Sequence, residues 1–240
     1  EYAHLTLFLG EDNKRLSKRH EATSLNVYKE MGFTKETIIN ALALLGWSTE
    51  NEIFSINELI ESFKLENVQK AAAVFDLKRF NWVSSQQLSK LSDNDFFEAI
   101  KPFMEDEDIN ENSSNYKKIL LAMRTAKTNL KDIAHATRPF FFELDGYDEK
   151  GVKKFLNESL ETLTFASEVL SKVPEWNETE LDMALIKVRD YFNLPIPKVN
   201  QPMRIALVGS TVSPSLGLTL ELFGKDKSLE RIQKAIDFIS

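Results

Sequence analysis

The spacing of hydrophobic and polar residues predicts helices for most of the chain. From residue 34 onwards apolar residues recur three and four positions apart, which places them on one face of a helix. Residues 3–9 alone alternate apolar and polar, as a strand with one buried face does. The helix expected after Thr34 has an apolar face formed by Ile38, Ile39, Leu42 and Leu45. The pattern therefore predicts a mainly α protein with one small β-strand.

Capping residues mark where several of these helices begin. Gly32 and Gly46 stand where helix C-caps belong. Further helices are expected near residues 148–172 and 177–192, then after a break at Pro195–Pro197, and a final one from Ser228. The expected N-terminal caps are Thr34, Asp76 and Asn129, together with Ser55–Glu58 and Ser92–Asp95 as capping boxes.

Composition narrows the class of protein. The 240 residues include 8 Gly and 7 Pro, too few for the frequent turns of an all-β chain. The absence of Cys excludes disulfides, thiolate zinc sites and a cysteine nucleophile. His4 and His135 have no metal ligands at suitable spacing, so no zinc or other metal site is expected. No apolar run has the roughly 18 residues of a membrane helix, which predicts a soluble protein.

Charge is segregated along the chain although the net charge is −7. Residues 93–111 carry eight acidic side chains against Lys101, whereas residues 117–138 carry six basic side chains against Asp132. A basic stripe of this kind is either a solvated helix face or a surface for RNA phosphates, and composition alone does not decide between them. Its members are Lys117, Lys118, Arg124, Lys127, Lys131 and Arg138.

The densest basic cluster follows the predicted strand. Lys14 to His20 could be a solvated loop tip, but the order Arg15-Leu16-Ser17-Lys18-Arg19 resembles the KMSKS signature of class I aminoacyl-tRNA synthetases. In that signature Lys18 matches the second lysine, while Arg15 and Leu16 replace the first lysine and the methionine. The resemblance implies that Lys18 and its loop hold the triphosphate of ATP, where charge develops on the pyrophosphate leaving group.

Other segments, in the right order over nearly all of the chain, look like bacterial-type glutamyl-tRNA synthetase. That family's HIGH-type motif and glutamate pocket lie upstream of the KMSKS loop, and this sequence contains no such segment. The matching segments are Tyr2–Leu5, Leu9–Asp12, Lys14–His20, Ala41–Ser48, Glu52–Ser55, Ala73–Leu77, Gln201–Pro202, Arg204, Ala206–Leu207, Gly209, Ser213–Pro214 and Phe223–Lys225.

The resemblance implies a C-terminal portion of a glutamate–tRNA ligase. Residues 1–76 would form the KMSKS loop and stem-contact fold, and residues 77–146 and 147–240 two helical anticodon-binding subdomains. The parent enzyme would join glutamate to tRNA(Glu) through glutamyl-adenylate, using ATP with Mg²⁺. This portion is expected to bind tRNA(Glu) as a cytoplasmic monomer, to need the N-terminal catalytic domain for glutamate and ATP, and to be inactive alone.

The same resemblance suggests which residues contact the anticodon. Arg124 and Lys127 are expected in the basic stripe, although Ala126 stands where some members carry a base-reading arginine, a departure that bears on discrimination between tRNA(Glu) and tRNA(Gln). A second group is Arg204, Ser213, Pro214 and Leu216, which would offer hydrogen bonds and apolar faces to an unstacked base. Ser213-Pro214 also reads as a helix N-cap and first turn, followed by Ser215 where the family often has Gly.

Aromatic residues do not by themselves indicate RNA binding. Phe96, Phe97 and Phe103 lie at helical spacing in the acidic stretch and are assigned to the core, whereas Phe140–Phe142 fits either a core or an exposed face. The rival function is a helical protein-interaction module with a vestigial KMSKS-like loop. A complete enzyme of other chemistry is disfavoured because no cysteine nucleophile, metal cluster or Gly-rich phosphate loop is present.

Overall fold

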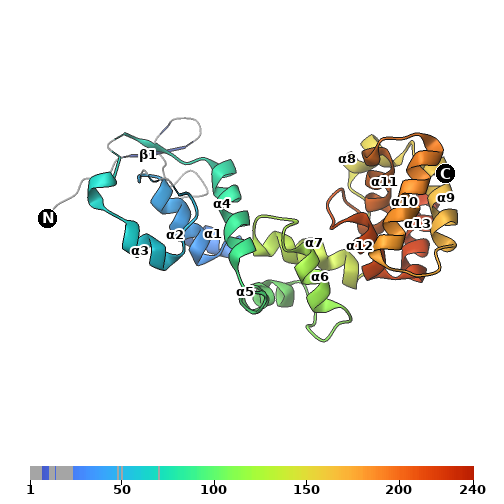
Figure 1. Ribbon diagram of the computed structural model, residues 1–240, viewed down its shortest axis with the longest axis horizontal. Helices are drawn as coiled ribbons and strands as arrows, with labels where there is room; N and C mark the ends of the chain where they lie inside the picture. The colour runs from blue at the N-terminus through green and yellow to red at the C-terminus, as the bar shows by residue number, and fades with distance from the viewer. Residues whose placement is uncertain (1–6, 11–13, 15–23, 48, 50, 70) are drawn as a thin grey trace. The chain divides into compact units, whose positions relative to one another are not determined.

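A computed structural model describes residues 7–10, 14, 24–47, 49, 51–69 and 71–240 (Figure 1). Nearly all of its regular structure is helical, which confirms the mainly α fold class. The chain divides into two compact units. The first unit comprises Glu1–Asp108 with Lys127–His135, and the second comprises Ile109–Ala126 with Ala136–Ser240. Domain borders at residues 76 and 146 stay a prediction.

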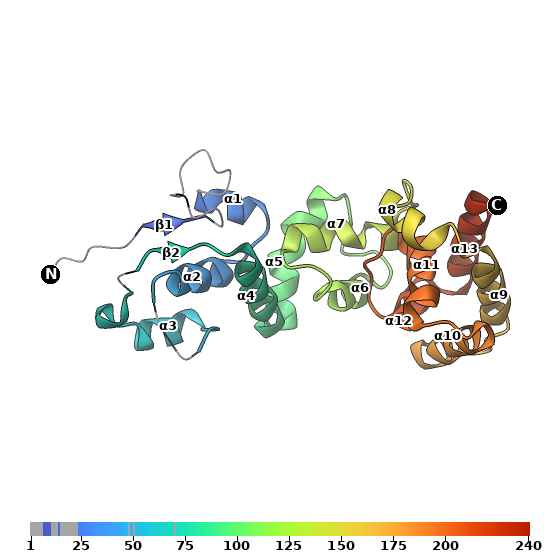
Figure 2. The same cartoon turned by 90° about the horizontal axis from the view of Figure 1, so that it is seen from above.

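In the described residues of the first unit, helices accompany one pair of two-residue strands (Figure 2). Strands β1 and β2 are parallel, with Phe8 opposite Ala73 and Leu9 opposite Val74. A single 3₁₀ turn, Leu65–Asn67, precedes β2. The elements are β1 (Phe8–Leu9), α1 (Leu25–Glu30), α2 (Lys35–Leu44), α3 (Ile56–Ser62), β2 (Ala73–Val74), α4 (Leu77–Lys90), α5 (Asp93–Asp106) and the start of α7 (Leu130–Phe141).

Aromatic rings form the centre of the first unit. The rings of Tyr28, Phe33 and Phe80 lie 4.7 to 6.1 Å apart, and Val83 completes their buried cluster. Such tilted and edge-to-face pairs are the favourable ring geometries. The cluster thus holds α1 and α4 together with the turn at Phe33.

The expected apolar face of α2 is only partly buried, which corrects the prediction. Ile39 and Leu42 are each 41% exposed, whereas Thr37 and Asn40 are 0% exposed. The buried polar groups have partners: Asn40 Nδ2 donates to the Glu52 carbonyl at 2.9 Å, and Asn40 Oδ1 accepts from the Phe54 N–H at 3.0 Å. Because buried polar groups need such bonds, the polar face of α2 lies towards the segment that contains Glu52 and Phe54, which supplies the hydrogen-bond partners.

A returning segment completes the first unit. The Leu130 N–H donates to the Gly32 carbonyl at 2.9 Å, and the Ser84 hydroxyl donates to the Thr128 carbonyl. Gly32 has φ of +84°, and a Cβ there would lie 2.5 Å from the Lys131 nitrogen. The expected glycine C-cap is therefore confirmed, and it also lets residues 127–135 approach closely.

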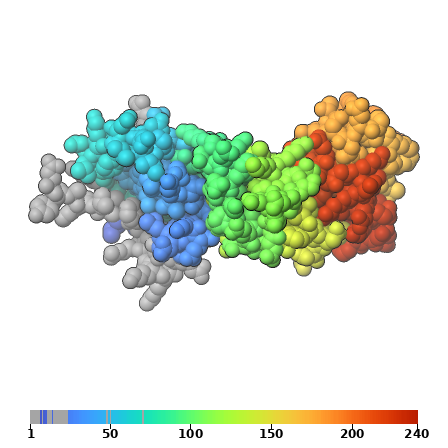
Figure 3. Space-filling model, turned by 90° about the horizontal axis from the view of Figure 1, so that it is seen from below, coloured from blue at the N-terminus to red at the C-terminus, as the bar shows by residue number. Residues whose placement is uncertain are grey.

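The second unit consists of helices around α11. Helix α11 contacts α8, α9, α10, α12 and α13 and buries most of its side chains, from Val199 to Val208. In the space-filling view of Figure 3 the residues from α8 to α13 are coloured yellow to red. The elements are α6 (Tyr116–Met123), the end of α7, α8 (Glu149–Gly151), a π-helix (Val152–Leu156), α9 (Leu160–Ser171), α10 (Glu178–Phe192), α11 (Ile196–Val208), α12 (Leu216–Phe223) and α13 (Lys225–Ile239).

Most of the predicted N-terminal caps are confirmed. Thr34, Asp76 and Asn129 cap α2, α4 and α7, and Ser55 with Glu58 forms a complete capping box. Ser92 caps α5, but the capping box expected there is incomplete. The Asp95 carboxylate accepts from the Ser92 hydroxyl at 2.7 Å and not from the Ser92 backbone N–H. These bonds join residues two or three apart, so one short stretch of sequence contains both partners.

Two helix bounds differ from the prediction. The stretch 148–172 is divided into α8, the π-helix and α9 rather than running as one helix. The final helix begins at Lys225, not at Ser228, whose hydroxyl is buried and donates to the Leu220 carbonyl at 3.3 Å. Among the residues that the structure describes, no helix has the length and apolarity needed to cross a membrane.

Candidate nucleic-acid interface

The predicted residues Arg204, Ser213 and Pro214 meet in the second unit. Arg204 lies on α11, and the other two lie in the loop before α12. Arg204 Nε donates to the Ser213 hydroxyl at 3.0 Å, and Nη2 donates to the Pro214 carbonyl at 3.3 Å. Partial burial lowers the pKa of the guanidinium. Nη1 donates to no residue that the structure describes, so this half-buried cation keeps one donor group for a ligand.

The loop enters α12 differently from the prediction. Ser215, not Ser213, occupies the N-cap position, and its side chain makes no capping bond to the first turn of the helix. Its φ of −49° and ψ of 147° are ordinary extended angles, so no glycine is required there. Leu216 is only 2% exposed and belongs to the core. It therefore offers little apolar surface to a base, in contrast to the half-buried Pro214.

Two carboxylates of α10 lie against the first turn of α12. The Gly217 N–H donates to Asp182 Oδ1 at 3.1 Å, and the Ser215 hydroxyl donates to Glu178 Oε1. Burial, with the nearby charge of Glu178, raises the pKa of Asp182, and the bond from Gly217 opposes this. Sequence reasoning missed both carboxylates because they are 35 and 37 residues from their partners.

The basic stripe is divided between the two units. Lys127 and Lys131 belong to the first unit, whereas Lys117, Lys118, Arg124 and Arg138 belong to the second. Arg124 is the C-cap of α6, and its N–H donates to the Leu121 carbonyl at 3.4 Å. Lys118 forms an ion pair with Glu221 of α12. The expected anticodon contacts Arg124 and Lys127 thus lie in different units, and their role stays a prediction.

The KMSKS-like loop Arg15, Leu16, Ser17, Lys18 and Arg19 lies outside the described residues, as do His4 and His20. Within the described part, Lys14 precedes it, and the Lys14 carbonyl accepts from the Gly10 N–H at 2.9 Å.

The aromatic residues considered for stacking are mostly engaged within the protein. Phe96 is fully buried. Phe140 stacks on Phe223, with ring centroids 4.7 Å apart and an angle of 9° between planes, and the Arg138 guanidinium lies 5.0 Å from the Phe142 ring centroid. These contacts favour a structural role for this stretch.

Arg231 of α13 is a buried cation that the sequence analysis did not single out. It is 1% exposed, and its guanidinium donates to the Leu207 carbonyl and, at 2.7 Å, to the Phe142 carbonyl. Its Cζ lies 4.5 Å from the Phe223 ring centroid. Its spacing of four from Ala235, which lies on the apolar face of α13, could have signalled this burial.

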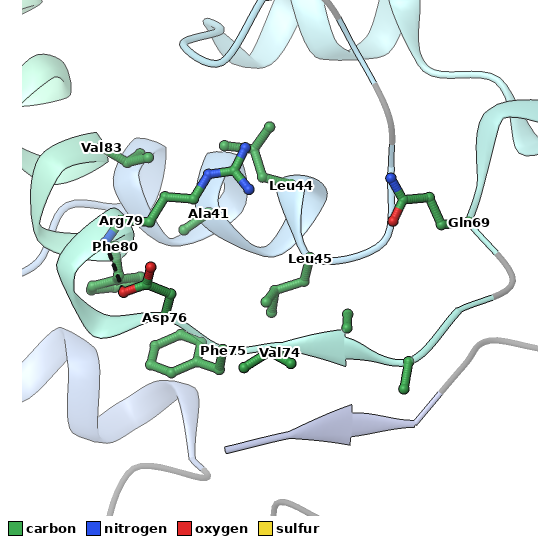
Figure 4. Close-up of a pocket in the computed structure, with 12 residues that line it drawn as sticks. Ala41, Leu44, Leu45, Gln69, Val74, Phe75, Asp76, Arg79, Phe80 and Val83 are labelled. Carbon is green, nitrogen blue, oxygen red and sulfur yellow. Dashed lines mark hydrogen bonds between the residues drawn. The ribbon is translucent and has the colours of Figure 1, made fainter. Parts of the chain in front are cut away.

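A cavity of about 380 Å³ lies in the first unit between α2, β2 and α4 (Figure 4). Arg79 on its wall is paired with Glu52 at 2.7 Å, and the Asp76 carboxylate caps α4. The described residues contain no cluster of three His, Asp or Glu side chains that could hold a metal ion. The wall of the cavity combines apolar side chains with the polar groups of Gln69, Asp76 and Arg79. The cavity is lined by Ala41, Leu44, Leu45, Gln69, Ala72, Ala73, Val74, Phe75, Asp76, Arg79, Phe80 and Val83.

Two protein-family models match the chain. The model described as an anticodon binding domain matches residues 95–236. The model of the catalytic domain of class I tRNA synthetases (E and Q) matches residues 1–82.

Proteins similar to this chain are named as glutamate–tRNA ligases. A glutamate–tRNA ligase of Thermodesulfovibrio yellowstonii is 34% identical, with 99% of this chain and 52% of the ligase covered. One from Legionella pneumophila is 35% identical, with 99% and 51% covered. A crystal structure of a glutamate tRNA ligase from Elizabethkingia meningosepticum in complex with its amino acid has a TM-score of 0.76 at 28% identity, covering 100% of this chain and 52% of that one. The chain thus spans about half the length of these relatives.

Proposed function

This chain belongs to the anticodon binding domain family, and from that membership we propose that its second unit binds the anticodon arm of tRNA(Glu). The observation that carries the proposal is the half-buried Arg204, oriented by Ser213 and Pro214 with one donor group left for a base edge or a phosphate. RNA is read in this way when unstacked bases meet fixed donors beside an apolar surface. The choice of tRNA(Glu) as the ligand comes from the relatives, which are named glutamate–tRNA ligase.

The chain's role is that of the C-terminal portion of a glutamate–tRNA ligase. Its parent would form glutamyl-adenylate from glutamate and ATP with Mg²⁺, and would then transfer glutamate to the tRNA. The parent enzyme would be a monomer in the cytoplasm. Residues 1–82, which match the catalytic-domain model, would supply Lys18 to the charge that develops on the leaving pyrophosphate. Binding of glutamate and ATP would require the N-terminal catalytic domain, which corresponds to the part of the relatives that this chain does not cover.

Binding to three tRNAs tests the proposal. The chain is titrated with tRNA(Glu), with tRNA(Glu) of altered anticodon and with an unrelated tRNA over a series of salt concentrations. We expect tighter binding to the first, weakening with salt, and a loss of about tenfold or more on Arg204→Ala for tRNA(Glu) alone. Equal binding to all three tRNAs would refute anticodon recognition, and a protein partner without salt-dependent RNA binding would favour an interaction module.

The catalytic role of Lys18 has a separate test in a full-length ligase that contains this chain. Lys18→Ala should lower glutamate-dependent exchange between ATP and pyrophosphate by about 10² to 10³. Unchanged exchange would refute the role of Lys18 and leave tRNA binding by the second unit unaffected.

A further inference from the structure

The first turn of α12 is held against α10 more closely than side-chain packing alone requires. A Cβ on Gly217 would lie 2.5 Å from Asp182 Oδ1 and 2.7 Å from the Glu178 carbonyl oxygen. Only glycine fits at such distances, and its N–H uses the space to donate to Asp182. Two residues before Gly217, the Ser215 hydroxyl donates to the Glu178 carboxylate. Residues 215–217 are therefore bound to α10 at two points.

The same segment is bound to Arg204 on its other side. The Thr219 hydroxyl lies 2.8 Å from the Ser215 carbonyl oxygen and 3.2 Å from the Ser213 hydroxyl oxygen. Ser213 in turn accepts from Arg204 Nε. Hydrogen bonds, together with the short backbone of residues 215–217 between them, thus link the carboxylates of α10 across the loop to the guanidinium on α11. Networks of this kind fix a conformation more firmly than isolated bonds do.

Glu178 is itself held in place by a charged neighbour. Its N–H donates to Glu221 Oε2 at 2.7 Å, and Glu221 is paired with Lys118 of α6. The Glu221 pKa is lowered by these bonds, so it stays ionised and keeps accepting at neutral pH. The start of α10 is therefore anchored before it contacts the loop.

The Asp182 carboxylate has two opposite effects on the fold, because it accepts the N–H of Gly217 in the first turn of α12 and is itself partly buried. Its pKa is raised by burial and by Glu178, which means that the ionised group is less favourable in the folded chain than in water. Groups that cost the fold free energy are found more often where a site needs them. Asp182 is one hydrogen bond from the loop that orients Arg204, and this position indicates a role in holding that loop.

We propose that Asp182 and Glu178 are positioning residues for RNA recognition, because they fix residues 213–217 and so set the angle at which Arg204 meets a base. The inference rests on the proposed function and deepens it. The two residues need not touch the RNA. They act through the Gly217 N–H and the Ser215 hydroxyl, so their loss should reduce discrimination between bases and leave phosphate contacts unchanged.

The test compares three single variants in the tRNA titration described above. Asp182→Ala removes the acceptor, Asp182→Asn keeps an oxygen in its place, and Asp190→Ala removes an exposed aspartate of the same helix as a matched control. The measured quantity is the ratio of affinities for tRNA(Glu) with its own and with an altered anticodon. We expect Asp182→Ala to lower this ratio about tenfold, Asp182→Asn to restore most of it, and Asp190→Ala to leave it unchanged.

Two further readouts separate positioning from general damage. The slope of log affinity against log salt concentration should be the same in all variants, because it counts phosphate contacts. Ser215→Ala, at an exposed residue, should keep the thermal midpoint of the wild type and lower the affinity ratio about threefold.

Several outcomes would overturn the inference. A wild-type ratio that survives both Asp182→Ala and Ser215→Ala would overturn it and leave the proposed function standing. A loss shared equally by both tRNAs would show a general effect on binding. A wild-type protein that does not discriminate between the two tRNAs would overturn the proposed function and this inference with it.

Discussion

Replacement of the buried Arg231 should destabilise the second unit, and the side chain chosen should decide by how much. Two backbone carbonyls, those of Leu207 and Phe142, depend on its guanidinium, which also lies over the Phe223 ring. Arg231→Met fills a similar volume without donors. Each buried carbonyl left without a donor costs about 1–3 kcal/mol, and the lost cation–π contact adds about 1 kcal/mol.

An opposing contribution reduces this loss. Burial lowers the pKa of Arg231, with only Glu143, Glu230 and Tyr147 opposing, so the charge itself is costly to bury. Removing that charge returns several kcal/mol, and the expected net loss for Arg231→Met is about 2 kcal/mol. Arg231→Lys should cost more, about 3 kcal/mol, because it keeps a buried charge whose compact ammonium cannot reach both carbonyls in the planar geometry of arginine.

Hydrogen exchange of the α13 amides during urea titration measures this effect within the second unit alone. Lys234→Met is the matched control, since Lys234 lies on the same helix, exposed, in ion pairs with Glu143 and Glu230. It should change exchange little. The reasoning is refuted if Arg231→Met is as stable as the wild type, because the cost of the buried charge would then offset the carbonyl bonds completely. It is also refuted if Arg231→Lys is the more stable of the two variants, because a remaining donor to the carbonyls would then outweigh the cost of the buried charge.

Three smaller changes test other parts of the fold. Asp76→Ala should cost about 1 kcal/mol by removing the cap of α4, measured by urea denaturation; an unchanged midpoint would show that the cap contributes nothing. Gly32→Ala should cost about 2 kcal/mol or more, because φ is positive and the Lys131 nitrogen is too close, whereas Gly46→Ala, with open space around it, should be mild. Asp182→Asn should raise the thermal midpoint at pH 7, because the folded pKa of Asp182 is raised. That gain should shrink as pH falls through the raised pKa and the wild-type carboxylate takes up its proton, and a gain independent of pH would contradict the cause given for the shift.

The parts of the fold that could be predicted from sequence are those whose partners are close along the chain. Ser55 bonds to the N–H of Glu58 three residues later, and Asp76 bonds to the first turn of its own helix. Arg204 and Ser213 are nine residues apart, and the resemblance to the synthetase family suggested both of them. Hydrogen bonds over such spans leave their donor and acceptor in one short stretch of sequence.

The parts that failed depend on contacts distant in sequence. Thr37 and Asn40 are buried because Ser84 and Gln87, 47 residues away, supply their partners. Nothing within α2 distinguishes these residues from solvated ones, so the hydrophobic pattern favoured Ile39 and Leu42. Arg231 is a stronger case, since its acceptor in Phe142 lies 89 residues earlier. Tertiary partners of this kind override the helical pattern, and although the place of Arg231 on the apolar face of α13 signals its burial, nothing in the local sequence indicates its acceptors.

The interleaving of the two units has a consequence for the order in which they can fold. Residues 127–135 belong to the first unit, and they follow Ile109–Ala126, which belongs to the second. During synthesis the first unit is therefore incomplete when Asp108 leaves the ribosome. The bond from the Leu130 N–H to the Gly32 carbonyl closes a loop of nearly one hundred residues, so it forms late and carries a large entropic cost. A nascent chain halted before residue 130 would expose the surface that residues 127–135 cover. When synthesis resumes, residues 127–135 would complete the first unit, and the residues from Ala136 onwards would then add to the second.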